Sequence, residues 1–377
     1  MRIKEISAVN FRNYTGLKLE TSAMTNIFYG QNAQGKTNIL EAVFYGAFGM
    51  SHRTSAEEEL LRLGSGEMAV SISFSSFGGE HELRIKKYQQ LGRAKKEILL
   101  DGTKIRPKEH YGTLNVVMFS PEDLQLVKGE PALRRRFLDM QIAQTDAVYY
   151  DLLVKYNRVL QQRNRLLKEI REQNDKNFER QLSVWDREFC SLAAAIVCRR
   201  LASLIRLQQI AGKIYTSITG HKENLTVRYE MKANSGQWLY PDSSSEDWEA
   251  FYEENLQARR QTDILRGSTG IGPHRDDMGL LLNCTSLRSF GSQGQQRSGA
   301  LALKLSQLEY VRQETGEFPV LLLDDVMSEL DAERRAQMLH FIDGRVQTFI
   351  TVNDRELIPE LAGCSYYEIV QGTVKRA

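Results

Sequence analysis

The sequence predicts an α/β fold in which segments from both ends of the chain form one head, with a helical coiled-coil lobe inserted between them. Two observations support this. Short apolar or alternating strands alternate with helical patterns in residues 1–130 and again in residues 221–377. Between them, residues 131–220 carry a heptad pattern with few helix breakers. We therefore expect an N-terminal part of the head, a helical lobe and a C-terminal part of the head.

The N-terminal part of the head begins with strands. Residues 2–10 and 18–20 have the composition of strands, and residues 25–29 are a short apolar run. Residues 36–48 place apolar side chains on one helical face and stop at Gly49, a typical helix C-cap. Further strands are expected at residues 69–74, 81–88, 96–100 and 115–119.

The inserted lobe is predicted to be an antiparallel coiled-coil hairpin. Its repeat positions alternate spacings of four and three, and the rhythm resumes after the polar stretch 172–177. These positions are Leu152, Tyr156, Val159, Arg163, Leu166 and Ile170, then Phe178, Leu182, Trp185, Phe189, Leu192 and Ile196. Arms of about 40 residues would be roughly 60 Å long. Arg163 interrupts the apolar seam, and we expect its guanidinium to reach out to solvent. Stacking on Trp185 is the alternative.

The C-terminal part of the head repeats the alternation of strands and helices. Strands are expected at residues 224–231, 279–282, 320–323, 348–352 and 366–370, and helices at residues 248–260, 294–313 and 331–341.

Composition excludes several classes of protein. The chain has 377 residues, Lys+Arg 50, Asp+Glu 48 and a net charge of +2. It has no apolar stretch of roughly 18 residues that would span a bilayer, and residues 1–6 do not resemble a signal peptide. The four cysteines (Cys190, Cys198, Cys284 and Cys364) lack metal-ligand spacing and are typical of reduced thiols in the cytosol. Without a metal-binding histidine motif, a metal site made of protein ligands alone is not expected.

Residues 30–37 read GQNAQGKT, a GxxxxGKT loop between an expected strand and an expected helix. Backbone N–H groups of such a loop surround phosphate oxygens at the positive end of the helix dipole. Lys36 would reach the β and γ phosphates, and Thr37 would offer its hydroxyl to Mg²⁺. The residues expected to bind ATP here are Gly30, Gln31, Asn32, Ala33, Gln34, Gly35, Lys36 and Thr37.

The apolar strand at residues 320–323 ends in two acids, Asp324 and Asp325. Taken alone, such a strand end is more often a turn or a helix cap. Together with the phosphate loop, it favours a catalytic interpretation. We expect Asp324 to hold hydrated Mg²⁺ with Thr37, and Asp325 to orient and deprotonate the attacking water.

Residues 290–297, FGSQGQQR, precede the expected helix at residues 294–313. This run resembles the signature loop of ABC-type ATPases, and residues 328–331, SELD, resemble their D-loop. The resemblance implies an ABC/SMC-like P-loop ATPase head in which the signature serine holds the γ-phosphate of ATP bound to a second subunit. Taken alone, the run would be a common helix-capping turn. The residues that the resemblance places in trans on the second subunit are Ser292, Gly294, Gln295 and Asp331.

Further runs extend the resemblance, over essentially the whole chain, to SMC-like ATPases of bacterial recombinational repair. They lie at residues 10–14, 51–54, 119–124, 134–139 and 272–277. The resemblance implies a slow, DNA-stimulated ATPase that acts as a switch in the cytoplasm. It further implies an ATP-dependent homodimer that clamps double-stranded DNA near gapped or single-stranded DNA. RecR, with RecO, would be its partner in assisting the loading of RecA.

The resemblance also bears on single residues. Arg12 would reach the ATP, as the equivalent arginine does in SMC-like heads. The sequence is equally compatible with a solvent-exposed arginine at the end of a strand. Asp325 replaces the usual glutamate, and its shorter side chain is expected to slow hydrolysis. Asn353 stands near the usual switch histidine, which leaves the γ-phosphate sensor unassigned. His274 and Arg275 are implied to lie near nucleotide or DNA, whereas a lone histidine is more often structural.

The charge is unevenly distributed along the chain. Residues 131–213 contain 16 Lys and Arg against 9 Asp and Glu, a net charge of +7, which leaves −5 for the remainder. Residues 81–110 contain nine basic and four acidic residues. Both stretches are candidate phosphate-contact surfaces, or ordinary solvated faces. The residues expected to contact DNA are Arg84, Lys86, Lys87, Lys95, Lys96, Arg134, Arg135 and Arg136.

Two other functions share some of these motifs. The nucleotide-binding subunit of an ABC transporter has the same phosphate loop and signature, but it lacks a long coiled-coil insertion. Another SMC-like chromosome ATPase would carry a far longer coiled coil than this chain can hold.

Overall fold

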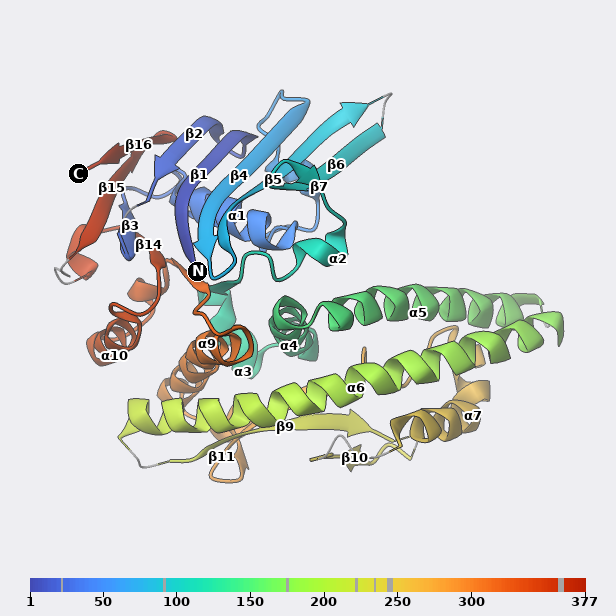
Figure 1. Ribbon diagram of the computed structural model, residues 1–377. Coiled ribbons are helices and arrows are strands. Elements are labelled where there is room, and N and C mark those ends of the chain that lie inside the picture. Colours follow the sequence, from blue (N-terminus) through green and yellow to red (C-terminus); the bar gives the residue numbers. More distant parts are fainter. Residues whose placement is uncertain are drawn as a thin grey trace. The chain divides into compact units, whose positions relative to one another are not determined.

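The computed structural model describes residues 1–377 except 22, 91–92, 174–175, 221–222, 234, 243–246 and 359–362. The chain divides into two units, one made of Met1–Leu124 with Lys304–Ala377 and one made of Gln125–Leu303 (Figure 1). The first unit contains both chain ends, as expected for the head. The second unit extends past the expected end of the lobe at residue 220, because a strand at Leu225–Lys232 and a helix at Trp248–Arg266 pack on its longest helix.

A largely parallel sheet carries the site in the first unit. Four of its six strands have almost every residue buried, as expected for a parallel sheet covered on both faces. In spatial order the strands are β16 (Thr373–Arg376), β15 (Cys364–Val370), β3 (Thr25–Tyr29), β14 (Thr348–Val352), β13 (Val320–Asp324) and β8 (Val116–Phe119). Only β16 is antiparallel to its neighbour.

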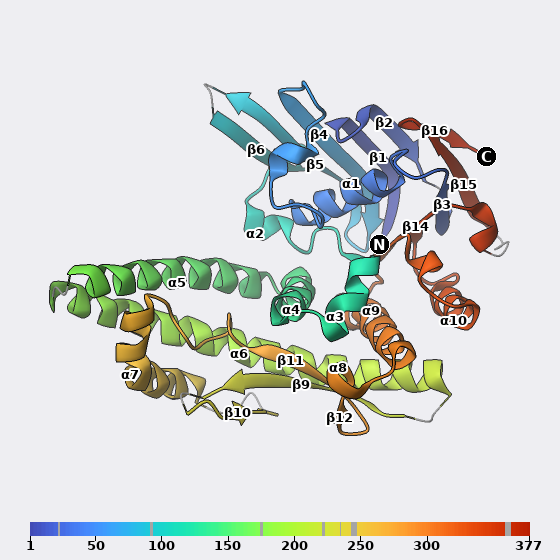
Figure 2. The ribbon, with the colours of Figure 1, turned by 180° about the vertical axis from the view of Figure 1, so that it is seen from behind.

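An antiparallel sheet forms the other layer of the first unit. In spatial order its strands are β2 (Tyr14–Glu20), β1 (Arg2–Phe11), β4 (Glu67–Ser76), β5 (Gly79–Gln90), β6 (Arg93–Leu100) and β7 (Thr103–Lys104). Helix α1 (Lys36–Phe48) contacts strands of both sheets and is buried almost all round (Figure 2). Its apolar composition on every side is what a helix between two sheets requires.

Short helices complete the first unit. They are η1 (Glu57–Leu60), α2 (Pro107–His110), η2 (Pro121–Leu124), η3 (Val326–Ser328), α10 (Ala332–Ile342) and η4 (Arg355–Leu357). Within the described residues, no helix of either unit is long and apolar enough to cross a membrane.

The second unit is built on a pair of long helices. Helices α5 (Ala147–Gln173) and α6 (Lys176–Thr219) run side by side in opposite directions (Figure 1). The turn residues 174–175 lie outside the described residues. Helix α5 has 27 residues, fewer than the expected 40, because Asp146 separates it from α4 (Pro131–Thr145). The Asp146 carboxylate accepts the backbone N–H of Val148 at 2.9 Å and so starts a new helix.

A small sheet and further helices pack with this pair. The strands are, in spatial order, β10 (Trp238–Leu239), β9 (Leu225–Lys232), β11 (Asp277–Leu282) and β12 (Thr285–Ser286). The helices are α3 (Gln125–Lys128), α7 (Trp248–Arg266) and α8 (Leu287–Phe290). The boundary between the two units falls inside α9 (Gln293–Thr315).

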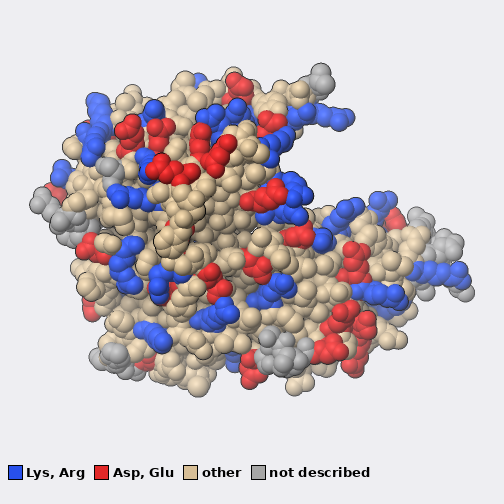
Figure 3. All heavy atoms as spheres, viewed as in Figure 1, with Lys and Arg blue, Asp and Glu red and all other residues tan. Residues whose placement is uncertain are grey.

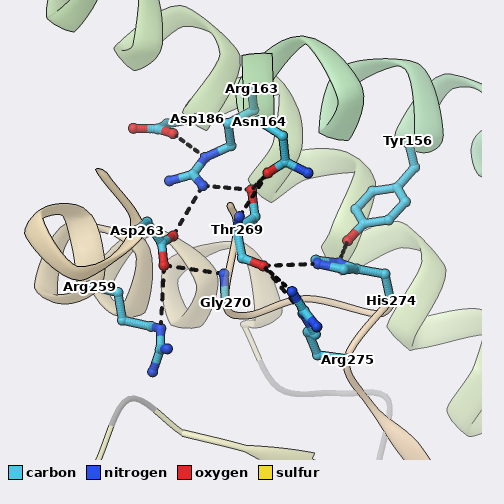
Figure 4. A network of polar contacts seen from close by, with 10 residues as sticks. All are labelled: Tyr156, Arg163, Asn164, Asp186, Arg259, Asp263, Thr269, Gly270, His274 and Arg275. Carbon is cyan, nitrogen blue, oxygen red and sulfur yellow. Dashed lines mark hydrogen bonds and ion pairs between the residues drawn. The ribbon is translucent and has the colours of Figure 1, made fainter. Parts of the chain in front are cut away.

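Arg163 is buried, and the expectation that it reaches solvent is wrong. Its side chain has 0% exposure and pairs with two acids, Asp186 at 2.7 Å and Asp263 at 3.1 Å (Figure 4). Its guanidinium lies 5.8 Å from the ring centroid of Phe189, and not on Trp185 as the alternative supposed. Two carboxylates make burial of the arginine tolerable, because they compensate its charge inside the protein.

Replacing Arg163 with alanine should lower the free energy of unfolding by about 3–5 kcal/mol, because Asp263, also 0% exposed, would lose its nearer arginine and keep only Arg259 at 3.8 Å. Urea denaturation measures the change. The control is Arg165→Ala, whose partner Glu169 forms an exposed i,i+4 pair on the same helix, with an expected loss below about 0.5 kcal/mol. Equal losses for the two variants would show that the buried pair has no special role.

Candidate nucleotide-binding site

The phosphate loop joins β3 to α1 and is fixed by the turn between β1 and β2. Gly35 has φ +113, and a Cβ there would lie 2.6 Å from the Asn13 amide nitrogen. The Tyr14 hydroxyl donates to the Gly35 carbonyl at 3.1 Å. At Gly30, with φ +144, a Cβ would lie 2.5 Å from the Ile369 carbonyl oxygen. The loop therefore requires glycine at both positions, for backbone conformation and for space.

Lys36 points back over its own loop. Its ammonium donates to the carbonyl oxygens of Gly30 at 2.5 Å and Gln31 at 2.8 Å, and to the side-chain oxygen of Asn353 at 3.0 Å. Burial lowers the pKa of Lys36, and the charges of Asp325 and Asp324 act in the opposite direction. Asn353 follows β14, at the position where the resemblance to ABC-type ATPases led us to look for a histidine. Sequence reasoning left this position without a role.

One carboxylate oxygen of Asp324 accepts hydrogen bonds from two hydroxyl groups. Thr37 and Thr351 each donate to it at 2.8 Å, from α1 and β14 respectively. A hydroxyl beside a carboxylate at the end of a strand offers the hard oxygen ligands that suit Mg²⁺, which keeps several waters and shares phosphate oxygens. Thr37 and Asp324 therefore fit the metal that the sequence predicted for them.

Asp325 is held in an unusual backbone conformation at the end of β13. Its φ is +52, and its N–H donates to the Thr351 hydroxyl at 2.9 Å. Ser328 donates to the Asp325 carbonyl at 2.7 Å. Burial raises the pKa of the Asp325 carboxyl, and the neighbouring charge of Asp324 adds to the effect. A raised pKa suits a general base, because it strengthens the carboxylate as a proton acceptor.

A cavity of about 770 Å³ lies in front of these residues, and Asp325 and Thr351 are among those that line it. This volume is in the range of small-molecule sites. Its walls include Arg12, Lys36, Thr37, Arg53, Asp325 and Asn353. All the described residues that line it belong to the first unit. The structure thus brings together the phosphate loop, Asp325 and Arg12, and it adds Arg53 and Asn353, which the sequence alone did not assign.

The signature loop belongs to the second unit and begins α9. The Ser292 hydroxyl accepts the N–H of Gln295 at 3.2 Å, and the Gln295 side chain accepts the N–H of Ser292 at 2.7 Å. This reciprocal pair is a capping box, which defines the helix start. Asp331 caps α10 by accepting the N–H of Arg334 at 2.9 Å. Both motifs therefore lie at helix N-termini, where backbone N–H groups favour anions.

Two of the lysines expected to contact DNA pair with acids on the face of the sheet that is turned toward α1. Lys87 is 8% exposed and pairs with Glu58 at 3.1 Å, and Lys96 pairs with Glu57 at 2.7 Å. Lys96 also lies over the ring of Tyr45 on α1. The prediction of a DNA contact is therefore not supported for Lys87 and Lys96. Side chains alternate along a strand, and these two share the inner face of the sheet.

The outer face of the same hairpin keeps the other basic residues. Arg84, Lys86 and Lys95 alternate with the inward positions on β5 and β6. Figure 3 shows Lys and Arg gathered toward the tip of this hairpin, while basic and acidic side chains are interspersed along α5 and α6. Arg84 pairs with Glu82 at 2.7 Å and is 44% exposed. These three residues remain predicted DNA contacts.

The three arginines of α4 differ in their surroundings. Arg134 is 3% exposed and forms two hydrogen bonds with Asp277, at 2.7 and 2.8 Å. Its role is structural, and the prediction that it contacts DNA is not supported. Arg135 donates to the Asp276 carbonyl at 2.8 Å, whereas Arg136 is exposed.

Most of residues 272–277 are buried in the second unit, although Arg275 is exposed. The His274 ring contacts the Tyr156 hydroxyl at 2.5 Å, and Arg275 lies against the Thr269 carbonyl (Figure 4). Burial lowers the pKa of His274 to about 4, so the imidazole is neutral at pH 7. Burial raises the pKa of Asp276 to about 7. These contacts connect His274 to Tyr156 and to the Thr269 carbonyl within the second unit.

The two-layer head, the phosphate loop, the paired acids and the signature loop define an ABC/SMC-like P-loop ATPase. The family model described as "RecF/RecN/SMC N terminal domain" matches residues 2–373. The chain belongs to the RecF family. A protein of Lachnoclostridium phytofermentans named "DNA replication and repair protein RecF" is 39% identical over 100% of both chains. A protein of the same name from Lactococcus lactis subsp. cremoris is 38% identical over 100% of this chain and 99% of its own.

Solved structures agree with this assignment. The structure described as "recombination mediator protein RecF-ATPrS in RecFOR pathway" has a TM-score of 0.90 and 35% identity, covering 99% of this chain and 97% of that one. Its RecF-ATP counterpart has a TM-score of 0.89 and 34% identity, covering 100% and 97%. An Smc head with a TM-score of 0.55 and 13% identity, covering 100% and 97%, shares the fold alone.

Proposed function

We propose that this chain is an ATP-dependent DNA-binding protein of recombinational repair. ATP and Mg²⁺ bind at the cavity of the first unit, and two heads then dimerise around the nucleotide. The dimer clamps double-stranded DNA near single-strand gaps through contacts to the phosphate backbone. Slow, DNA-stimulated hydrolysis reopens it. RecR and RecO are the partners, and loading of RecA is the result.

One observation carries this proposal. Lys36, Thr37 and Asp325 line one cavity in the first unit, and Asp324 is bonded to Thr37 beside it, whereas Ser292 stands at a helix start in the second unit. A hydroxyl at a helix N-terminus is suited to an anion. A second subunit would bring Ser292 to the γ-phosphate and so complete the site. The RecF-ATP relatives support the choice of nucleotide.

The residues of the cavity divide the chemistry among them. Lys36 neutralises the β and γ phosphates, and Thr37 and Asp324 would hold the metal, which supplies positive charge for the developing negative charge of phosphoryl transfer. Asp325 orients a water and accepts its proton. Its side chain is one methylene shorter than glutamate. The carboxylate of Asp325 would therefore lie farther from the attacking water, which favours a low rate of ATP hydrolysis, as suits a switch.

Replacing Ser292 with alanine should weaken ATP-dependent dimerisation at least about 10-fold while leaving ATP binding by the monomer unchanged, because a hydroxyl bonded to a charged phosphate contributes about 1.5–3 kcal/mol. Sedimentation with ATP or ADP, with and without gapped duplex DNA, measures dimerisation. The parent should dimerise and hold DNA with ATP only, and RecR should co-sediment with that dimer.

The matched control is Ser289→Ala, an exposed serine three residues earlier in the chain, which should dimerise as the parent does. If Ser292→Ala dimerises as tightly as the parent, the signature loop does not close over the nucleotide. If the parent stays monomeric with ATP and DNA, the clamp is wrong.

A further inference from the structure

Glu41 is a buried acid behind the nucleotide cavity. It lies on α1, one turn beyond the phosphate loop, and its side chain has 0% exposure. Its two carboxylate oxygens accept hydrogen bonds from Arg12 Nη2 at 2.7 Å and Nε at 2.8 Å. The Ser51 hydroxyl donates to it at 2.5 Å, and Arg53 Nη1 lies 3.8 Å away. One carboxylate thus joins two arginines from distant parts of the chain.

The charge of Glu41 is maintained by these contacts. Burial alone would raise the pKa of Glu41, but the hydrogen bonds from Arg12 and Ser51 lower it below its usual value. A buried carboxylate without partners would be strongly unfavourable, so its environment is built for the ionised form. The ion pair is therefore present at neutral pH.

Arg12 keeps donors available for a ligand. A guanidinium has five N–H groups. Two of them bond Glu41 and one bonds the Glu59 carbonyl at 2.9 Å. The remaining donors belong to a side chain that lines the cavity. Glu41 therefore fixes the plane of the guanidinium without using all its hydrogen-bonding capacity.

Arg53 lines the same cavity from the loop after α1. Its Nη1 donates to the Asn38 side-chain oxygen at 3.2 Å, and its side chain is 48% exposed. Asn38, on α1, in turn donates to the Asn13 side chain at 2.8 Å. These two hydrogen bonds connect Arg53 to the β1–β2 turn that carries Arg12. Polar contacts therefore hold both arginines at the cavity.

We propose that Glu41 is a positioning residue that orients Arg12 and Arg53 as a pair of cationic donors for the phosphate chain of the nucleotide. The proposal rests on the proposed binding of ATP in this cavity. Planar guanidinium groups recognise phosphate through paired hydrogen bonds, and their orientation determines how well they do so. If Glu41 only held α1 against its surroundings, its replacement would lower the free energy of unfolding and leave the Kd for ATP unchanged.

A mutant cycle separates the two roles. Glu41→Gln keeps the shape of the side chain and removes its charge. Calorimetric titration of the full chain with ATP should show a Kd raised about 10-fold. In a variant with both Arg12→Ala and Arg53→Ala, adding Glu41→Gln should change the Kd by less than about 2-fold, because the groups that Glu41 positions are gone.

The control is Asp263→Asn, which removes a carboxylate that is also 0% exposed and paired with an arginine. It should lower the midpoint of thermal unfolding without changing the Kd for ATP. The inference is overturned if Glu41→Gln leaves the Kd unchanged or lowers it, or if its full effect persists in the double-arginine variant. If the parent itself does not bind ATP, the proposed function fails and not this inference alone.

Discussion

Replacing Lys36 with methionine should raise the Kd for ATP at least about 100-fold and keep the protein monomeric in its presence. Lys36 is the charge that the loop presents to the β and γ phosphates, and its present partners are two carbonyls and the Asn353 amide. Charge-assisted hydrogen bonds to phosphate are among the strongest that a side chain makes. Methionine keeps the apolar stem, so the helix it begins should remain intact.

Calorimetric titration with ATP measures the Kd, and sedimentation in the presence of ATP shows whether the protein is monomeric. Lys18→Met is the matched control, since Lys18 is 70% exposed and lies on β2; its Kd should equal that of the parent. A Lys36→Met protein that binds ATP within about 3-fold of the parent would show that this loop is not the phosphate site.

Replacing Asp325 with asparagine should lower kcat for ATP hydrolysis about 10²–10⁴-fold while the Kd for ATP changes little, because general-base catalysis contributes this much. The ATP-bound dimer should then persist. Only the carboxylate form of Asp325 accepts a proton. Because its pKa is raised, hydrolysis by the parent should decline on acidification at a pH above the usual range of an aspartate.

Single-turnover hydrolysis measured across pH tests both statements. Asp343→Asn, an exposed acid at the end of α10, should keep the parent rate and pH profile. If Asp325→Asn hydrolyses ATP at the parent rate, Asp325 is not the base. If the profile of the parent is flat, the raised pKa of Asp325 does not govern the reaction.

Local patterns predicted most of the elements around the site. Helix α1 has the bounds expected from its apolar face and Gly49, and the apolar runs at β3, β13 and β14 form neighbouring strands of the parallel sheet. These elements are specified by short-range spacing, which the sequence displays directly. The phosphate loop and Asp325 line one cavity because the carboxyl ends of parallel strands meet at one sheet edge.

Long-range partners were not predictable in this way. Asn353 contacts Lys36 across 317 positions of the chain, and Asp263 meets Arg163 across 100. No local pattern shows such pairs. The inward direction of Lys87 was visible in principle, because Leu83 and Ile85 precede it at a spacing of two and are buried on the same face. The number of charges in residues 81–110 does not reflect this alternation, and Lys87 was therefore predicted to contact DNA although its side chain faces inward.

The position of β3 in its sheet has a consequence for the order in which the protein is completed during synthesis. Both neighbours of β3, β14 and β15, come from the last 30 residues of the chain. The hairpins of the antiparallel sheet pair within residues 2–104 and need no later segment. The strand that precedes the phosphate loop therefore stays without these sheet partners until residues 348–370 have been synthesised. The cavity beside the phosphate loop consequently forms only once segments more than 300 positions apart, such as those that carry Lys36 and Asn353, are both present.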